Sequence, residues 1–397
     1  MKKDTVLDKA KNPKYFIVTV ILIAFGMFLV GFDANLFFFG GTFILSIIHV
    51  NPLLLGITAT GFAAGITIFS IIGGFVFDKI TTRNGILISL LIITTFSMLT
   101  GFVTNEYELV IYRFLVGFGT GMIQPEISAF LGDLRPGMRA TTIAAEGVAF
   151  NLGLASSPYI FAQFSTATTF NIPFIIAGIS GGILMLLIFL IIPSTYKIKE
   201  RPKVGIRQVM NRSLFFMAIS YFMFGIAFFA YEGYFTPYLI SSGISKEVAA
   251  SIVSFFGIAG MILAFPGAFA GDKLERKHII QLATVVMSLG TIVMFLPHIN
   301  PLLATIAVIL LGGGYAIYGN IQAFAQESVE DAWIGTAVGF LFMIFNIGAM
   351  IGGPLMGFSV SDFGYIYAGI ISIVTPMVLS IFFASLAPKV PKRIRTV

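Results

Sequence analysis

The chain has 397 residues, of which 57% are hydrophobic and 11% are charged, a composition that excludes an ordinary soluble globular protein of this size. It contains no cysteine, which excludes disulfides and thiol catalysis, and its three histidines have no metal-ligand spacing, so we expect no metal or other cofactor. The net charge of +6 lies in short basic segments beside apolar stretches, which indicates membrane topology and not a nucleic-acid partner.

Apolar stretches of roughly 20 residues, the length of a helix that crosses a ~30 Å hydrocarbon core, recur between charged or turn-rich breaks. They predict an all-α membrane protein with twelve transmembrane helices, at about 15–41, 53–79, 85–104, 107–132, 140–163, 172–194, 213–241, 246–271, 278–297, 301–326, 335–359 and 364–387. The first stretch contains Asp33 and is too long for the apolar region of a signal peptide, so we expect it to be a membrane span.

Lysine and arginine are distributed very unevenly between the two sides that this topology defines. With the N-terminus in the cytoplasm, 22 of the 24 basic residues fall in cytoplasmic segments. Of the other two, Lys246 falls on the side of the membrane opposite the cytoplasm, and Arg113 lies within a helix. Because cytoplasmic loops of membrane proteins are rich in lysine and arginine, we expect a multi-pass protein of the cell membrane with both termini in the cytoplasm.

The two halves of the sequence match at an offset of about 195 residues, as expected of a transporter formed by duplication. The matches are Gly73-x4-Asp78-Lys79-x3-Arg83 with Gly267-x4-Asp272-Lys273-x3-Lys277, Phe150-Asn151-Leu152-Gly153 with Phe345-Asn346-Ile347-Gly348, Gly117-x-Gly119 with Gly312-x-Gly314, and an acid late in the first helix of each half, Asp33 and Glu232. We therefore predict a six-helix bundle in residues 1–193, a cytoplasmic linker in 194–212 and a second six-helix bundle in 213–397.

Three motifs resemble those of the major facilitator superfamily. GGFVFDKITTRNG is similar to its signature between helices 2 and 3, with a threonine where a glycine is usual. IYRFLVGFGTG is similar to its helix 4 signature, and FLVGFDANLFFFGG looks like the first helix of its sugar porters and metabolite-proton symporters. The resemblance implies two pseudo-symmetric bundles in a monomeric transporter.

Asp33 and Arg113 are expected in the outer half of the membrane. An ionisable residue within a span costs about 3 kcal/mol on insertion scales, so each asks for a functional explanation. If the two side chains pair in one state and separate in another, the carboxylate can bind and release a proton. The family resemblance implies proton coupling at this aspartate, with the helix 4 arginine as its partner. The alternative is a static salt bridge that only fixes two helices.

Helical spacing places Gln124 on one stripe with Arg113, Gly117 and Thr120, which indicates the wall of a cavity. For Gly117, close packing against a neighbouring helix is an equal alternative. Gln124 is therefore a candidate substrate residue.

Four further residues are candidates for the proton and substrate path. Glu232 has aromatic neighbours and is expected to bind a sugar hydroxyl, an amine or a second proton, or else to form a structural pair. Glu126 and Glu146 lie near the cytoplasmic ends of their helices, where they form either a proton relay or a hydrogen-bonding network at an inner gate. Asn346 is included as the repeat partner of Asn151.

The loops after the second helix of each half are expected to close the cytoplasmic side, because each carboxylate can meet a helix N-terminus or an arginine. The alternative is a purely topological role for the charges. The expected gate residues are Gly74, Asp78, Lys79, Arg83, Asp272, Lys273 and Lys277.

Together these features predict a secondary transporter that moves a small organic solute, such as a sugar or carboxylate, by alternating access with H+ symport. The alternative is proton-driven efflux of amphipathic compounds, which Glu232 as a partner for cations favours. An enzyme is not expected, because the chain has no nucleophile–base constellation at one membrane depth. A scaffold or receptor would not need buried acids in both halves.

Overall fold

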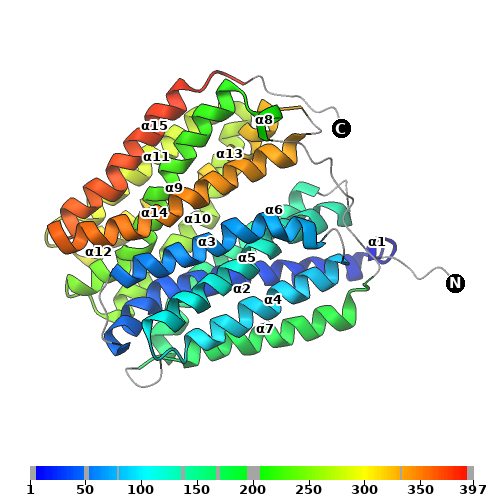
Figure 1. Ribbon diagram of the computed structural model, residues 1–397, viewed down its shortest axis with the longest axis horizontal. Coiled ribbons are helices and arrows are strands. Elements are labelled where there is room, and N and C mark those ends of the chain that lie inside the picture. The colour runs from blue at the N-terminus through cyan, green and yellow to red at the C-terminus, as the bar shows by residue number, and fades with distance from the viewer. Residues whose placement is uncertain are drawn as a thin grey trace. The chain divides into compact units, whose positions relative to one another are not determined.

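The structure of the protein is a computed structural model that describes residues 6–48, 53–77, 80–135, 139–166, 170–194, 206–330 and 333–390. Within these ranges every regular element is helical and no strand occurs, which confirms the predicted all-α class (Figure 1). The helices before residue 200 are α1 (Val6–Lys9), α2 (Pro13–Ile48), α3 (Leu53–Phe77), α4 (Thr82–Thr100), α5 (Glu106–Leu134), α6 (Arg139–Phe164) and α7 (Ile172–Ile191). Those after it are α8 (Ile206–Val209), α9 (Arg212–Ser241), α10 (Lys246–Lys273), α11 (Arg276–Met294), α12 (Pro301–Gly312), α13 (Tyr315–Ser328), α14 (Ile334–Gly369), a π-helical segment (Ile370–Val374) and α15 (Thr375–Leu386).

Each of the twelve predicted segments coincides with helix in the described residues. Among the described residues, ten stretches are long and apolar enough to cross a membrane. The last of these, Ile334–Leu386, has 53 residues, enough for two spans. It bends at Gly364, whose φ of 75° is a conformation that residues with a Cβ rarely adopt. This bend separates the predicted helices 335–359 and 364–387. The chain is therefore a multi-pass membrane protein.

The chain divides into two compact units, Met1–Glu200 and Arg201–Val397. The division falls inside the stretch 194–212 that the sequence predicts to be a linker. Of that stretch, 195–205 lie outside the described residues, and α8 follows directly.

In the first unit, α2 and α6 pack so closely that only glycine fits at two positions. A Cβ added at Gly31 would overlap the carbonyl oxygen of Phe150, and one added at Gly153 would overlap that of Phe28. Small residues let the backbones of membrane helices approach in this way.

The second unit repeats this contact between α9 and α14. A Cβ added at Gly225 would overlap the carbonyl oxygen of Phe345, and one at Gly348 would overlap that of Phe222. These four residues stand 194 or 195 positions after their counterparts in the first unit. The two units are thus built on the same helix crossing, in the register that the sequence repeat predicts.

A second repeated crossing involves α3 with α5, and α10 with α12. A Cβ at Gly117 would overlap the carbonyl oxygen of Phe62, and one at Gly312 would come within 3.0 Å of the carbonyl oxygen of Phe256. Gly117 therefore serves close packing, which is one of its two predicted roles. At the same offset of 195 residues, Val308 in the second unit occupies the position of Arg113 in the first.

Candidate functional site

Asp33 on α2 and Arg113 on α5 form an ion pair in the first unit. Nη1 of Arg113 donates a hydrogen bond of 2.8 Å to Oδ2 of Asp33. The side chain of Arg113 is 0% exposed and that of Asp33 is 3% exposed. The pairing that the sequence predicts is therefore present. Because a buried charge without a partner is costly, removal of either residue would leave the other unpaired inside the bundle.

Polar atoms of this pair remain available for another group. Oδ1 of Asp33, together with Nε and Nη2 of Arg113, is buried without a hydrogen-bond partner in the described part of the chain. The guanidinium lies over the rings of Phe37 and Phe62, at 4.3 and 4.8 Å from their centroids. These rings hold the guanidinium plane by cation–π attraction and leave its remaining N–H groups without an acceptor.

The stripe that continues from Arg113 along α5 is partly polar. Thr120 is buried, and its hydroxyl has no hydrogen-bond partner among the described residues, whereas Gln124 is half-buried. Thr120 therefore offers a hydrogen-bonding group on the same helical face as the ion pair.

The two acids expected near the inner ends of their helices are both buried. Glu126 lies on α5, and Glu146 on α6 accepts a hydrogen bond of 2.7 Å from the hydroxyl of Ser128 on α5. This bond joins α5 to α6.

In the second unit, Glu232 on α9 lies within electrostatic reach of three tyrosines, Tyr231 on its own helix and Tyr315 and Tyr318 on α13. It is 5% exposed, and no described lysine, arginine or histidine forms an ion pair with it. Glu232 is therefore a buried acid among aromatic groups.

Glu232 is not the equivalent of Asp33 in the repeat. Because Gly31 corresponds to Gly225 at the helix crossing, Asp33 corresponds to Ala227, and Glu232 lies five residues further along α9. The interpretation of Glu232 as the repeat counterpart of Asp33 is wrong, and its chemistry has to be argued from its own surroundings.

Asn346 and Asn151 use their side chains in the same way in the two units. Nδ2 of Asn346 donates to the carbonyl of Phe342 one turn earlier, and Nδ2 of Asn151 donates to that of Gly147, both at 2.9 Å. Each amide nitrogen thus uses one of its two N–H groups within its own helix, which leaves the second N–H group and the carbonyl oxygen of Asn346 outside this bond.

The expected gate residues are only partly placed. Asp78 and Lys79 lie outside the described residues, and so does the side chain of Asp272. Gly74 lies in the last turn of α3, and Lys273 places its ammonium 4.4 Å from the centroid of the Phe269 ring.

Arg83 and Lys277 have equivalent partners that the sequence analysis did not predict. Arg83 donates to the carbonyl oxygens of Phe189 and Ile192 at the end of α7, and Lys277 donates to that of Ala387 at the end of α15. Cations stabilise the C-terminal ends of helices through such bonds. In each unit this basic residue therefore fixes the last helix of the bundle.

Glu327 at the end of α13 is a further charged residue that the sequence analysis missed. Its Oε1 lies 2.8 Å from Nη2 of Arg276, in an ion pair that links α13 to α11. The repeat contained a signal for it, since Phe324-x2-Glu327 matches Phe130-x2-Asp133 at an offset of 194.

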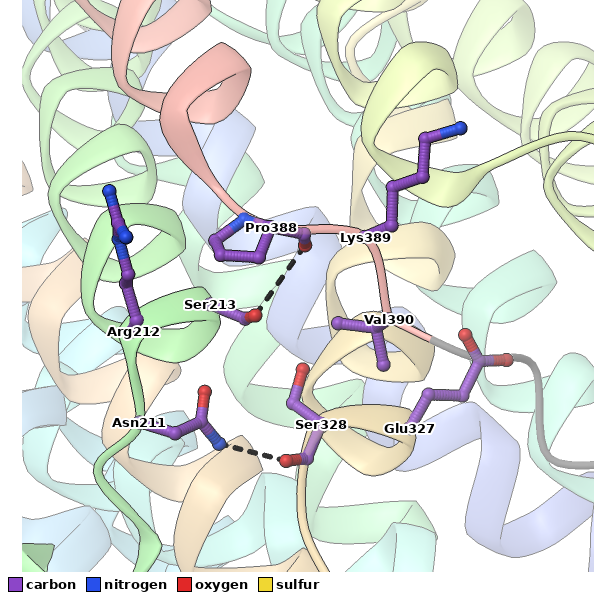
Figure 2. Close-up of a pocket in the computed structure, with 8 residues that line it drawn as sticks. All are labelled: Asn211, Arg212, Ser213, Glu327, Ser328, Pro388, Lys389 and Val390. Atoms are coloured by element: carbon purple, nitrogen blue, oxygen red, sulfur yellow. Dashed lines mark hydrogen bonds between the residues drawn. The ribbon is translucent and has the colours of Figure 1, made fainter.

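A cavity of about 570 Å³ lies beside this ion pair, where α9 begins and α13 ends (Figure 2). Asn211 donates to the carbonyl of Ser328 across it at 2.8 Å, and Ser213 donates to that of Pro388 at 3.5 Å. Its lining consists of Asn211, Arg212, Ser213, Glu327, Ser328, Pro388, Lys389 and Val390. None of the residues expected to bind solute or proton belongs to this lining.

The sequence profile of the Major Facilitator Superfamily matches residues 23–352 and 243–397, which together cover most of the chain. The chain belongs to the Major Facilitator Superfamily. The fold and the family that the sequence motifs indicate are therefore both confirmed.

Among characterised members of the superfamily, the chain is similar to transporters of organic acids. It is 23% identical to a hexuronate transporter of Bacillus subtilis over 348 residues, which cover 81% of this chain and 82% of that protein. It is 22% identical to the 4-hydroxybenzoate transporter PcaK of Acinetobacter baylyi, over 76% of each chain.

Solved structures of the superfamily share the fold. A D-xylose-proton symporter superposes with a TM-score of 0.76 at 15% identity, covering 95% of this chain and 98% of that one. The nucleoside transporter NupG, as its D323A mutant, superposes with a TM-score of 0.79 at 14% identity, covering 93% and 100%.

Proposed function

We propose that the protein is a secondary transporter of the cell membrane, with both termini in the cytoplasm, which carries a small polar organic solute together with H+ by alternating access. The observation that supports this most directly is the buried ion pair between Asp33 and Arg113. Charged residues inside a membrane bundle are costly, so such a pair is expected to have either a structural or a functional role.

The polar atoms of this ion pair that have no hydrogen-bond partner favour a functional role over a purely structural one. A purely structural pair is most stable when all its donors and acceptors are satisfied, whereas one carboxylate oxygen and two guanidinium nitrogens here have no partner in the described chain. Protonation of Asp33 would cancel the attraction and leave Arg113 available to an anionic or hydroxyl group of a solute. Binding of the proton and binding of the solute are then linked.

The relatives suggest which solutes to test. The hexuronate and 4-hydroxybenzoate transporters are named for organic acids, and a guanidinium with unused N–H groups suits a carboxylate. We therefore place organic acids first among the candidate solutes and sugars second.

Transport of this kind is tested with the full chain in proteoliposomes. Radiolabelled 4-hydroxybenzoate, gentisate, glucuronate and D-xylose are offered with an inward proton gradient, with no gradient, and with the gradient plus a protonophore. The proposal expects at least one solute to accumulate above equilibrium only in the first condition. Accumulation that is unaffected by the protonophore would rule out proton coupling.

Efflux of amphipathic compounds remains a second candidate because Glu232 lies among tyrosines without a cation of its own. It is distinguished by direction in the same liposomes. An outward movement of lipophilic cations driven by an opposing proton gradient, with no uptake of the acids or the sugar, would favour efflux over symport.

A further inference from the structure

The first observation concerns charge in the second unit. The repeat places Val308 where the first unit has Arg113, so the second unit has no arginine at this helix position. Glu232 is nevertheless buried, and no described cation pairs with it. A buried acid of this kind is stable either as the neutral acid or beside a cation, and no described residue supplies that cation. A cationic group of a ligand is therefore the partner that would stabilise the ionised form of Glu232.

The second observation concerns hydrogen-bonding groups beside Glu232. The hydroxyl of Thr236, one turn further along α9, is fully buried without a partner in the described chain. The hydroxyl of Tyr231 is likewise buried without a hydrogen-bond partner in the described chain, and Tyr231 is 1% exposed. Thr236 follows Glu232 by four residues on the same face of α9, and Tyr231 directly precedes it, so two unpartnered hydroxyl groups flank the acid along the helix.

The third observation concerns the aromatic walls and the space between them. The ring of Tyr231 meets those of Phe228 and Phe256 at 5.2 and 5.6 Å between centroids, and Phe256 lies 5.4 Å from Tyr315. Gly233, directly after Glu232, is buried, yet a Cβ there would meet no atom within 4 Å. Open space is thus present at the backbone position directly after Glu232, on a helix whose rings cluster with those of α10 and α13.

From these three observations we infer that Glu232, Tyr231, Thr236, Tyr315 and Tyr318 form a binding site for the ammonium group of a small organic ligand. A protonated primary amine donates three hydrogen bonds, which the carboxylate and the two hydroxyl oxygens accept. The faces of the surrounding rings attract the same positive charge. A carboxylate ligand would be repelled by Glu232, and a neutral hydroxyl group would leave its charge uncompensated.

This inference goes beyond the proposed function and does not depend on proton coupling through Asp33. Its test is therefore an equilibrium binding measurement on the purified full chain in detergent, without any gradient. The probe is tyramine. Its matched controls are tyrosol, which carries a hydroxyl in place of the amine, and 3-(4-hydroxyphenyl)propionate, which carries a carboxylate there.

We expect calorimetry to detect tyramine binding and to find both controls at least about tenfold weaker. Glu232→Gln should weaken tyramine by about tenfold or more, and Thr236→Val by about threefold, because each removes an acceptor of the ammonium group. Glu232→Asp, which keeps the charge, should retain more of the affinity than Glu232→Gln. The exposed Glu247 provides the control, since Glu247→Gln removes an acid of the same unit and should leave affinity unchanged.

Three results would overturn the inference. They are equal affinity for tyrosol and tyramine, unchanged tyramine affinity in a folded Glu232→Gln variant, or a tyramine Kd weaker than about 10 mM for the wild-type chain. Thr236→Val provides an independent check if Glu232→Gln does not fold. Because no transport is measured, these results leave the proposed symport open to its own test.

Discussion

Arg113 contacts Asp33 through one nitrogen only, so this buried pair is a single hydrogen bond of 2.8 Å and not the two-pronged contact of which arginine is capable. The remaining nitrogens, Nε and Nη2, lie beside the rings of Phe37 and Phe62 without an acceptor in the described chain. A pair with this geometry can separate at a lower cost than a bidentate pair.

Removal of the arginine alone should destabilise the protein strongly. In Arg113→Gln the carboxylate of Asp33 stays buried without its cation, which costs about 3–5 kcal/mol. The double variant Asp33→Asn with Arg113→Gln should recover a large part of this loss, because neither charge is then left. Thermal unfolding in detergent of the wild type, both single variants and the double variant measures the difference. Strictly additive effects would mean that the two residues do not interact.

The glycine at the α2–α6 crossing should not tolerate a methyl group. Gly31→Ala would force its Cβ into the carbonyl oxygen of Phe150, and overpacking of this kind costs about 1–3 kcal/mol. The matched control is Gly182→Ala on α7, where an added Cβ meets nothing within 4 Å. There alanine should be neutral or slightly stabilising, since it is the better helix former. A melting temperature of Gly31→Ala equal to that of the control would contradict the packing described for α2 and α6.

Glycine-to-alanine substitution at the equivalent crossing of the second unit should destabilise the protein to a similar extent. Gly225→Ala would bring its Cβ into the carbonyl oxygen of Phe345, at the equivalent crossing of α9 and α14. We expect its loss of melting temperature to resemble that of Gly31→Ala. A large loss in one unit and none in the other would show that the two crossings are not equivalent.

The contact between Glu275 and Lys389 predicts a dependence on pH. The hydrogen bond from Lys389, together with the charge of its ammonium, lowers the pKa of the Glu275 carboxyl below its usual range, against the opposing effect of its partial desolvation. A lowered pKa in the folded state means that the contact stabilises the protein above the ordinary glutamate pKa and that this contribution is lost as the pH falls through the lowered value. Glu275→Gln should therefore melt slightly below the wild type at pH 7, and the difference should vanish towards about pH 3. An equal or larger difference at the lower pH would contradict this assignment.

The helices were predictable because their apolar runs are long and the breaks between them are charged. Asp33 and Arg113 were predictable as a pair because ionisable residues within spans are few, and helical rise places both at a similar depth. The pattern did not reveal that Gly117 serves the crossing of α3 and α5, since a glycine on a polar stripe fits a cavity wall equally well.

The partners of the loop charges were less accessible to sequence reasoning. Arg83 and Lys277 bind backbone carbonyl groups at the ends of α7 and α15. Because every residue has a backbone carbonyl, the residue types do not indicate which one accepts. The relation of Glu232 to Asp33 was misjudged because both are acids late in a first helix, whereas the register is set by Gly31 and Gly225. The other matches of the repeat, at offsets of 194 or 195, agree with the register of the packing, whereas Asp33 and Glu232 are 199 positions apart.

The most direct test of proton coupling through Asp33 compares two transport modes of Asp33→Asn with those of the wild type in proteoliposomes. The solute is whichever of 4-hydroxybenzoate, gentisate, glucuronate or D-xylose the wild type accumulates. The proposed function predicts that the variant loses accumulation driven by the proton gradient but retains exchange of labelled for unlabelled solute, because exchange needs no net movement of protons. Accumulation by Asp33→Asn at the wild-type level would contradict the proposal that Asp33 couples transport to the proton gradient.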